Sequence, residues 1–596
     1  MRTISKFPIL VTAVSFLPFT SLGQKTSIAG ENGKEWITIS NGYTKMLIDI
    51  DEKYSPEFGS DEGVAFYDTL IGVPTMANVL AQRKDKESVL IAFKTARQKE
   101  ANLKVKQDLD ILITKTELGF RTQDFEFNHE VNFFNPTNTV YGGIKTLLDD
   151  QTPADRRYAA VSRLRKYAGL ESGYQPVTEI LMERTTTQMN KSGMVYPSRQ
   201  NMEVVLSRNS SMVDGIRELF IKYKISGWEE PYAAIKKQLE AFDKWIREEL
   251  IPKGRTDFRL PPEKYKLALE NYGIDIPPAE IAKMAHAAFT NIQEQMKPLA
   301  AEIAKKYNLN STNYRDVILF LKKNQIIGDS ILPIYESHLS VIENIIRQNK
   351  IVSLPNRPAI IKIATAAETA QQPAPHMVPP PFLNNTGQRG VFVLPLNMPA
   401  ASGEKLDKYD DFTFDAASWT IIAHEVRPGH EMQYDKMVEE GVSQARALYA
   451  FNSTNVEGWG LYSEYITLPF MPVEGQLVSL DYRLLRAARA FLDPELQAGT
   501  ITRQQAMDVL LNEVVSSHAF AQQEVERYTL RAPGQANSYF YGFTKMIALR
   551  KDTEQALGLK FNQLRFHDFV LSQGILPPAL IKEAVMEDFV PVEKSN

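Results

Sequence analysis

The feature that most constrains this chain is the segment from His424 to His430, HEVRPGH. A His–Glu pair followed closely by a second histidine indicates two imidazole ligands for a zinc ion and a carboxylate placed to handle its water. In the usual zinc-protease spacing, the second histidine follows four residues after the first, so both lie on one helical face. Here it follows after six residues, which on a straight helix would place His430 roughly 120° away from His424.

Pro428 and Gly429 predict a break between the two histidines. The proline ring lacks an N–H and clashes with the carbonyl four residues back, which belongs to His424. Gly429 tolerates almost any backbone angle. A break here could turn His430 back toward the metal. The alternative is a helix that ends at a Pro-Gly turn, with two unrelated histidines near its end.

A second stretch, NVEGWGLYSE at residues 455–464, supports the metal interpretation. Many zinc hydrolases complete a His₂Glu site with a glutamate from a following helix, and Glu457 lies at a suitable distance downstream. Glu464 follows seven residues later and falls on the same helical face. Two glutamates on a partly apolar helix need a compensating charge, which a cation supplies.

The chain resembles the bacterial "domain of unknown function 885" family in three blocks, HEVRPGHEMQ, NVEGWGLYSE and PGQANSYFYGFTKMIALR. Weaker similarity runs from about residue 60 to the C-terminus, including FRLPPEKYKLALENYGI and PPPFLNNTGQRGVFVLP. The resemblance implies a largely helical fold related to the glutamate-zincin metallopeptidases. Many members carry His-His where this chain has His430-Glu431, so the last ligand position is open to two interpretations.

The expected site holds zinc through His424, His430 and Glu457, with one position left for water. Glu425 would accept a proton from that water and pass it to the leaving amine. The reaction would be hydrolysis of a peptide or other amide bond. No cysteine is present to act as a nucleophile, and no Gly-x-Ser-x-Gly segment indicates a serine hydrolase.

Three further side chains are expected around this centre. Glu464 would hydrogen-bond either a metal ligand or Tyr462, which places both in the surrounding shell. Tyr539 lies in the third family block, and its hydroxyl could donate to the oxyanion formed during hydrolysis. The alternative for Tyr539 is an ordinary core tyrosine on an amphipathic helix.

Residues 390–396 are the clearest strand by β-branched and aromatic content, and they follow a proline-rich segment at 373–381. An exposed strand edge can bind a peptide as an additional strand. With the family resemblance, this predicts substrate contacts along Val391, Phe392 and Val393. The alternative is a strand buried within a small sheet.

Apolar periodicity predicts helices over 228–251, 279–307, 314–323 and 331–349, with Pro252 ending the first. Asp415 is the expected N-cap of the helix that carries His424, with Trp419, Ile422 and Val426 on its buried side. The fold class expected is mainly α: a large multi-helix zinc-metallopeptidase-like body with a small β-sheet beside the metal helix. The expected regions are 24–260 and 261–372, both helical, and a catalytic region over 373–596.

The first 23 residues have the pattern of a secretory signal peptide, with Arg2 and Lys6 before an apolar run and small residues near Gly23. This predicts export to the periplasm or the medium. The chain has no cysteine and therefore no disulfide framework or lipid-modified cysteine, so no stable membrane anchor is expected. A net charge of −4 argues against a nucleic-acid partner.

The sequence leaves two competing functions open. One is a non-catalytic exported peptide-binding protein with a structural metal, although Glu425 would then have no role. The other is a zinc hydrolase of non-peptide amides or esters, which the residues do not separate from a peptidase.

Overall fold

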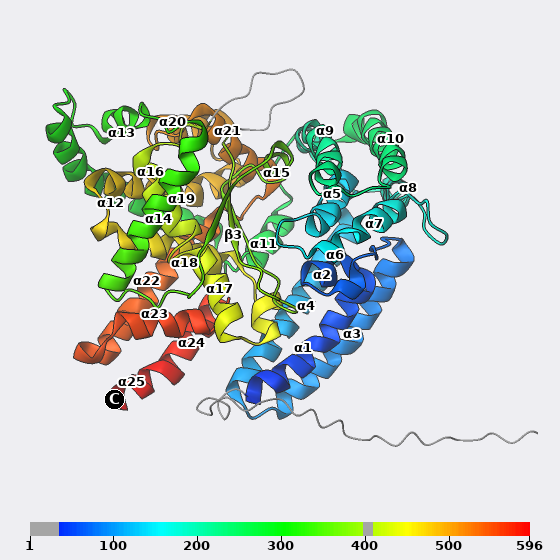
Figure 1. The fold of residues 1–596 in the computed structure, drawn as a ribbon, viewed down its shortest axis with the longest axis horizontal. Helices are drawn as coiled ribbons and strands as arrows, with labels where there is room; N and C mark the ends of the chain where they lie inside the picture. Colours follow the sequence, from blue (N-terminus) through cyan, green and yellow to red (C-terminus); the bar gives the residue numbers. More distant parts are fainter. Residues whose placement is uncertain (1–34, 397–408, 596) are drawn as a thin grey trace, which may run out of the picture.

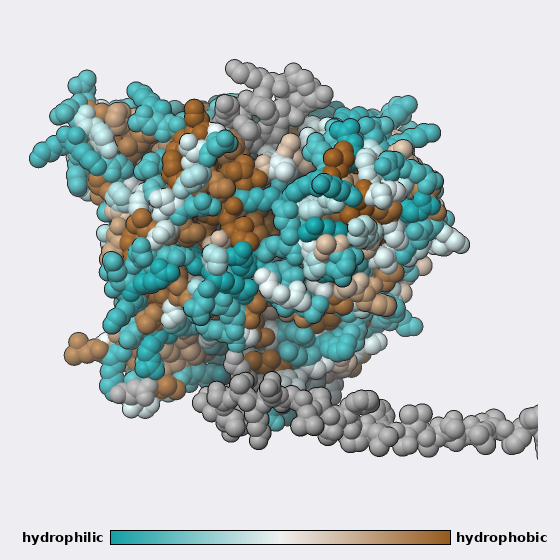
Figure 2. Space-filling model, in the orientation of Figure 1, coloured by the Kyte–Doolittle hydropathy of each residue, from teal (hydrophilic) through white to brown (hydrophobic). Residues whose placement is uncertain are grey.

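Helices form nearly all of the secondary structure in the computed structural model, which describes residues 35–396 and 409–595. The predicted signal peptide at 1–23 lies outside the described residues. Within these ranges no helix combines the length and the apolar character needed to cross a bilayer. Hydrophilic residues cover most of the face shown in Figure 2, with apolar side chains gathered mainly toward the upper centre. The mainly-α prediction is confirmed, and the described residues include a small three-stranded sheet.

The predicted amphipathic helices form close to their expected bounds. They are α12 (Pro278–Tyr307), α13 (Tyr314–Lys322) and α14 (Ile331–Gln348). The helix expected over 228–251 is α10 (Glu229–Trp245), which continues into a π-helical turn at Ile246–Leu250. Pro252 lies in the short 3₁₀ turn that ends this stretch, as its missing N–H requires.

The N-terminal helices form two groups (Figure 1). The first contains α1 (Glu35–Tyr54), α3 (Met76–Lys99) and α4 (Leu103–His129), and the second contains α5 (Pro136–Leu147) and α7 to α10. Apolar residues of α1, α3 and α4 belong to the same hydrophobic cluster as the C-terminal helices, whereas α5 and α7 to α10 share a second cluster with α15 (Ala366–Gln371). The hydrophobic clusters therefore do not follow the division at residue 260.

The sheet has three short strands, β1 (Ile360–Ile363), β2 (His376–Val378) and β3 (Val391–Leu394), in the order β1-β3-β2. β3 pairs in parallel with β1 and antiparallel with β2. It is the central strand, so the prediction that Val391, Phe392 and Val393 present a free edge for substrate is wrong. Both sides of the β3 backbone are already hydrogen-bonded, and the free edges belong to β1 and β2.

Five helices of the C-terminal half carry or adjoin the predicted motifs: α16 (Asp415–Glu425), α17 (His430–Glu440), α18 (Ser453–Thr467), α19 (Val473–Ala498) and α22 (Asn537–Leu557). α19 is buried along most of its length, with α12 and α16 against it. α18 and α22 pack closely because glycines meet at their crossing. A Cβ atom on Gly542 would lie 1.9 Å from the Thr454 carbonyl oxygen, which no larger residue could avoid.

The start of α16 differs slightly from the prediction. Phe414 is the N-cap, and Asp415 is the first helical residue, with an exposed side chain 3.4 Å from His338 Nε2. An acidic residue in the first turn still interacts favourably with the helix dipole. Trp419, Ile422 and Val426 are buried, as predicted.

Candidate metal centre

The two histidines of the central motif lie on separate helices. His424 is in the last turn of α16, and His430 is the first residue of α17. A Cβ atom at Gly429 would lie 1.7 Å from the carbonyl oxygen of His424, so only glycine allows this close reversal. The indole N–H of Trp459 donates to the Pro428 carbonyl oxygen (2.8 Å) and ties the break to α18. The break predicted from Pro428 and Gly429 is present.

This arrangement brings the three predicted ligands together. The ligand atoms of His424, His430 and Glu457 all lie within 4.8 Å of one another. Glu457 Oε2 is 3.4 Å from His424 Nε2 and 3.5 Å from His430 Nε2. Ligand atoms about 2.1 Å from a tetrahedral zinc would be separated by about 3.4 Å, so these spacings fit one ion.

The hydrogen bonds around the imidazoles leave both Nε2 atoms facing the centre. His424 Nδ1 donates to Glu464 Oε1 (2.7 Å), and His430 Nδ1 donates to Gln433 Oε1 (3.3 Å). In the neutral ring, a protonated Nδ1 leaves a lone pair on Nε2, which is the form that binds metal. In the neutral form of each ring, these hydrogen bonds therefore favour the ligating tautomer.

The chemistry of Glu457 also fits a cation. Its Oε2 is buried without a hydrogen-bond partner, which is costly for a carboxylate. Although burial alone would raise the pKa of Glu457, contact with His424 and His430 holds that pKa well below its usual value. The centre thus presents an ionised carboxylate and two imidazole nitrogens, a donor set suited to zinc.

Glu425 lies beside the cluster without joining it. Its carboxyl is buried, and its Oε2 has no hydrogen-bond partner. Burial raises the pKa of Glu425 to about 8, with His430 acting to lower it and Glu457 to raise it. A carboxyl group beside the candidate ligands, with a pKa near neutrality and one oxygen without a partner, is suited to exchange a proton with a reacting water.

Glu431 occupies a different environment from the ligands. Its carboxylate accepts from Arg427 Nε (2.8 Å) and Nη2 (3.2 Å), and burial raises its pKa to about 8. Arg427 also contacts Glu343. Glu431 is therefore held by Arg427 away from the cluster, and His430 is the residue whose Nε2 faces Glu457 Oε2.

Tyr539, on α22, lies at the margin of the centre. Its ring is nearly parallel to that of His424, with centroids 6.2 Å apart. Arg527 Nη2 donates to the Tyr539 hydroxyl (2.9 Å), which leaves the phenolic proton available for another acceptor. Burial raises the pKa of Tyr539, so the hydroxyl stays protonated at neutral pH.

Tyr462 points elsewhere, so its predicted contact with the metal shell is wrong. His567 Nδ1 donates to the Ile351 carbonyl (2.7 Å), so its Nε2 accepts from the Tyr462 hydroxyl (2.8 Å). Arg550 also donates to that hydroxyl (3.1 Å). Two residues along a helix correspond to about 200°, so Tyr462 and Glu464 face nearly opposite directions.

Several residues of the centre were not predicted. Thr420 donates to Glu464 Oε2 (2.9 Å), and Arg486 lies 3.5 Å from Glu464 Oε1. Gln433 donates to Asn455 Oδ1 (3.1 Å), while Glu425 and Glu457 both contribute to the raised pKa of the buried Tyr434. Helical spacing offered a signal for the three that lie one turn from a histidine, Thr420, Gln433 and Tyr434. Asn455 lies on the same helix as Glu457, and Arg486 comes from a distant segment, α19.

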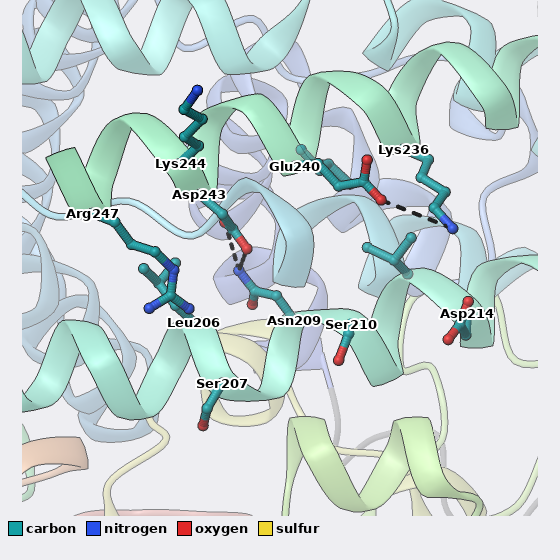
Figure 3. Close-up of a pocket in the computed structure, with 12 residues that line it drawn as sticks. Leu206, Ser207, Asn209, Ser210, Asp214, Lys236, Glu240, Asp243, Lys244 and Arg247 are labelled. Atoms are coloured by element: carbon teal, nitrogen blue, oxygen red, sulfur yellow. Dashed lines mark hydrogen bonds and ion pairs between the residues drawn. The ribbon is translucent and has the colours of Figure 1, made fainter. Parts of the chain in front are cut away.

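A prominent cavity elsewhere has no such chemistry. A space of about 540 Å³ lies between α9 (Arg199–Lys222) and α10 (Figure 3). Asn209 Nδ2 donates to both oxygens of Asp243 (2.9 and 3.0 Å), and Lys236 faces Glu240. Four of its polar side chains pair with one another, and no histidine lines it, so the metal centre is the stronger candidate site.

We expect Glu464→Gln to weaken metal binding about 10- to 100-fold, because the charge that orients His424 and favours its ligating tautomer is lost. The measurement is a zinc affinity obtained by competition with a chelator. Glu495→Gln is the matched control, since Glu495 accepts from His286 at the same 2.7 Å outside the cluster. Equal affinities for the two variants would contradict a positioning role.

Fold and site together define a mainly helical protein with a buried His–His–Glu cluster. The chain matches the family described as "Bacterial protein of unknown function (DUF885)" over residues 56–585, and it belongs to that family. The predicted family membership is confirmed.

Two solved structures share this fold. One is "a putative lipoprotein of unknown function from Shewanella oneidensis", with TM-score 0.68 and 17% identity, covering 93% of this chain and 100% of that one. The other is "the putative lipoprotein from Colwellia psychrerythraea", with TM-score 0.70 and 18% identity, covering 94% and 99%. No curated protein matches the chain.

Proposed function

We propose that this protein is an exported zinc-dependent hydrolase that cleaves peptide bonds. The observation that carries the proposal is the convergence of His424 Nε2, His430 Nε2 and the unpartnered Glu457 Oε2 at zinc-ligand spacings. A bound zinc ion would supply Lewis-acid chemistry and an activated water at neutral pH.

Side chains of the protein would carry out the proton transfer, stabilise the oxyanion and orient the metal ligands. Glu425 accepts the proton of the attacking water and delivers it to the leaving amine. The Tyr539 hydroxyl, held by Arg527, donates to the oxygen that gains negative charge. Glu464 and Gln433 keep the two imidazoles oriented. Glu425 is what favours a hydrolase over a binding protein, since metal binding alone gives that buried carboxylate no role.

The proposed location is the periplasm or the medium. The basic and apolar pattern of residues 1–23 supports export. The description of two structural relatives as putative lipoproteins points the same way, toward the cell envelope.

The proposal is tested by digestion of a peptide mixture, read by mass spectrometry. Zinc-loaded protein should generate new termini, whereas chelated protein and the Glu425→Gln variant should not. Zinc-loaded protein that retains peptides without cleaving them would indicate a binding protein instead. Cleavage restricted to non-peptide amides or esters would make the proposed substrate class wrong.

A further inference from the structure

Arginines gather on the side of the centre marked by Tyr539. Arg489 on α19 donates to Glu524 (2.8 Å), and its guanidinium lies 4.7 Å from the centre of the Tyr539 ring. Arg527 lies 5.2 Å from the same ring and 3.5 Å from Glu524. The Glu524 carboxylate thus contacts both arginines, and Arg527 also donates to the Tyr539 hydroxyl.

A second pair of arginines continues this positive region. Arg208 from α9 pairs with Glu526 (2.9 Å). Arg531, at the end of the π-helical turn that begins at Arg527, donates only to the amide oxygen of Gln372 (3.3 Å) and forms no ion pair within the described parts of the chain. Two glutamates therefore face four arginines. Burial, together with Arg208 and Arg527, lowers the pKa of Arg531 to about 10, and the opposing effect of Glu526 does not offset this shift.

Arg531 lines a cavity of about 410 Å³ between the N-terminal helices and the segment Thr529–Pro533. Aromatic side chains line it as well: Phe133, Phe134, Tyr196, Phe258 and Tyr272. The acidic residues of the cavity have other partners, since Glu130 pairs with Lys264 and Glu126 interacts with Lys264 and Arg184. The charge of Arg531 is therefore not balanced from within the cavity.

The cavity adjoins the helix that carries Glu457. The backbone N–H and the hydroxyl of Thr454, at the start of α18, both donate to the Tyr272 carbonyl (3.0 and 2.7 Å). Arg527 also acts electrostatically on the Tyr272 phenol. Tyr272 thus links the cavity wall to Arg527 on one side and to α18 on the other.

From this geometry we propose that Arg531 binds a carboxylate of the substrate, with the charge of Arg527 behind it, while an adjoining side chain enters the aromatic cavity. Guanidinium groups suit this role, because their planar fork binds carboxylates through two parallel hydrogen bonds. The carboxylate is either the C-terminus of a peptide or an acidic side chain. The inference rests on the proposed peptidase function for its substrate class, and it adds the feature by which peptides are selected.

The test is affinity selection on immobilised Glu425→Gln protein, which should bind without turnover. Random N-acetyl hexapeptides are offered as free acids and as C-terminal amides, and retained peptides are quantified by mass spectrometry. Free acids should be enriched at least about tenfold, since a hydrogen bond to a charged group contributes about 1.5–3 kcal/mol. If the only amides retained are those that contain Asp or Glu, the bound carboxylate comes from a side chain.

Arg531→Gln should remove the enrichment. The matched control is Arg503→Gln, which removes the same charge. Like Arg531, Arg503 donates to a glutamine amide oxygen, here that of Gln200. Thermal melting of each variant separates lost recognition from lost folding. Equal retention of all peptide classes, no retained peptide, or the same response in both variants would overturn the inference.

Parallel digestion with wild-type protein separates this inference from the proposed function. Selective retention without any cleavage would leave carboxylate recognition standing and overturn the peptidase. Cleavage that does not distinguish free acids from neutral amides would support the peptidase and overturn carboxylate recognition.

Discussion

Glu425→Gln is expected to bind zinc near the wild-type stoichiometry and to lose hydrolysis by a factor of about 10²–10⁴. The glutamine keeps the volume of the buried side chain but cannot accept a proton from water. Because Glu425 stands outside the cluster of ligand atoms, its replacement should leave the ligand set intact. The measurements are metal content and initial rates on the same preparation.

The control for this variant is Glu439→Gln. Glu439 lies on α17 and pairs with Arg357 (3.0 Å) outside the centre, so the rate should not change. A Glu425→Gln protein that keeps most of its turnover would show that another group carries the proton, and the assignment of Glu425 would be wrong.

His430→Ala should release zinc and abolish hydrolysis. The substitution removes one of three protein ligands and leaves the charge of Glu457 with only His424 opposite it. After dialysis, metal content should fall to background in elemental analysis, while the helical signal in circular dichroism persists.

Glu431→Gln is the matched comparison, because it alters the neighbouring residue that could have been the ligand. Glu431 contacts Arg427, so metal content should stay near wild type. Its weakened contact with a buried arginine should lower the free energy of unfolding by about 1–3 kcal/mol. Zinc loss in Glu431→Gln with retention in His430→Ala would reverse the ligand assignment.

Local sequence rules predicted the helices well where the determinants are local. The bounds of α12, α13 and α14 follow from apolar spacing and from the residues at their ends. The break between His424 and His430 likewise follows from Pro428 and Gly429, because steric exclusion acts within a few residues.

Features set by distant contacts could not be predicted in this way. β3 was identified by composition, but its central position depends on pairing with β1 and β2, which the strand itself does not encode. The ion pair that occupies Glu431 becomes visible only once Arg427 is placed beside it. Tyr462 is a different case, since the helical repeat already turns it away from Glu464.

The three candidate ligands were predicted from a short motif and from a glutamate one helix further along the chain. The surrounding contacts were not, because Arg486 and Arg527 approach from other helices and carry no local signal. The sequence therefore predicted which side chains converge. The hydrogen bonds that orient the two histidines became visible only in the tertiary structure.

The most direct test of the central claim is anomalous diffraction at the zinc absorption edge from crystals of the zinc-loaded protein. We expect one strong peak about 2.0–2.2 Å from His424 Nε2, His430 Nε2 and a Glu457 carboxylate oxygen. The absence of a peak there, or a peak coordinated by Glu431 with His430 turned away, would contradict the account.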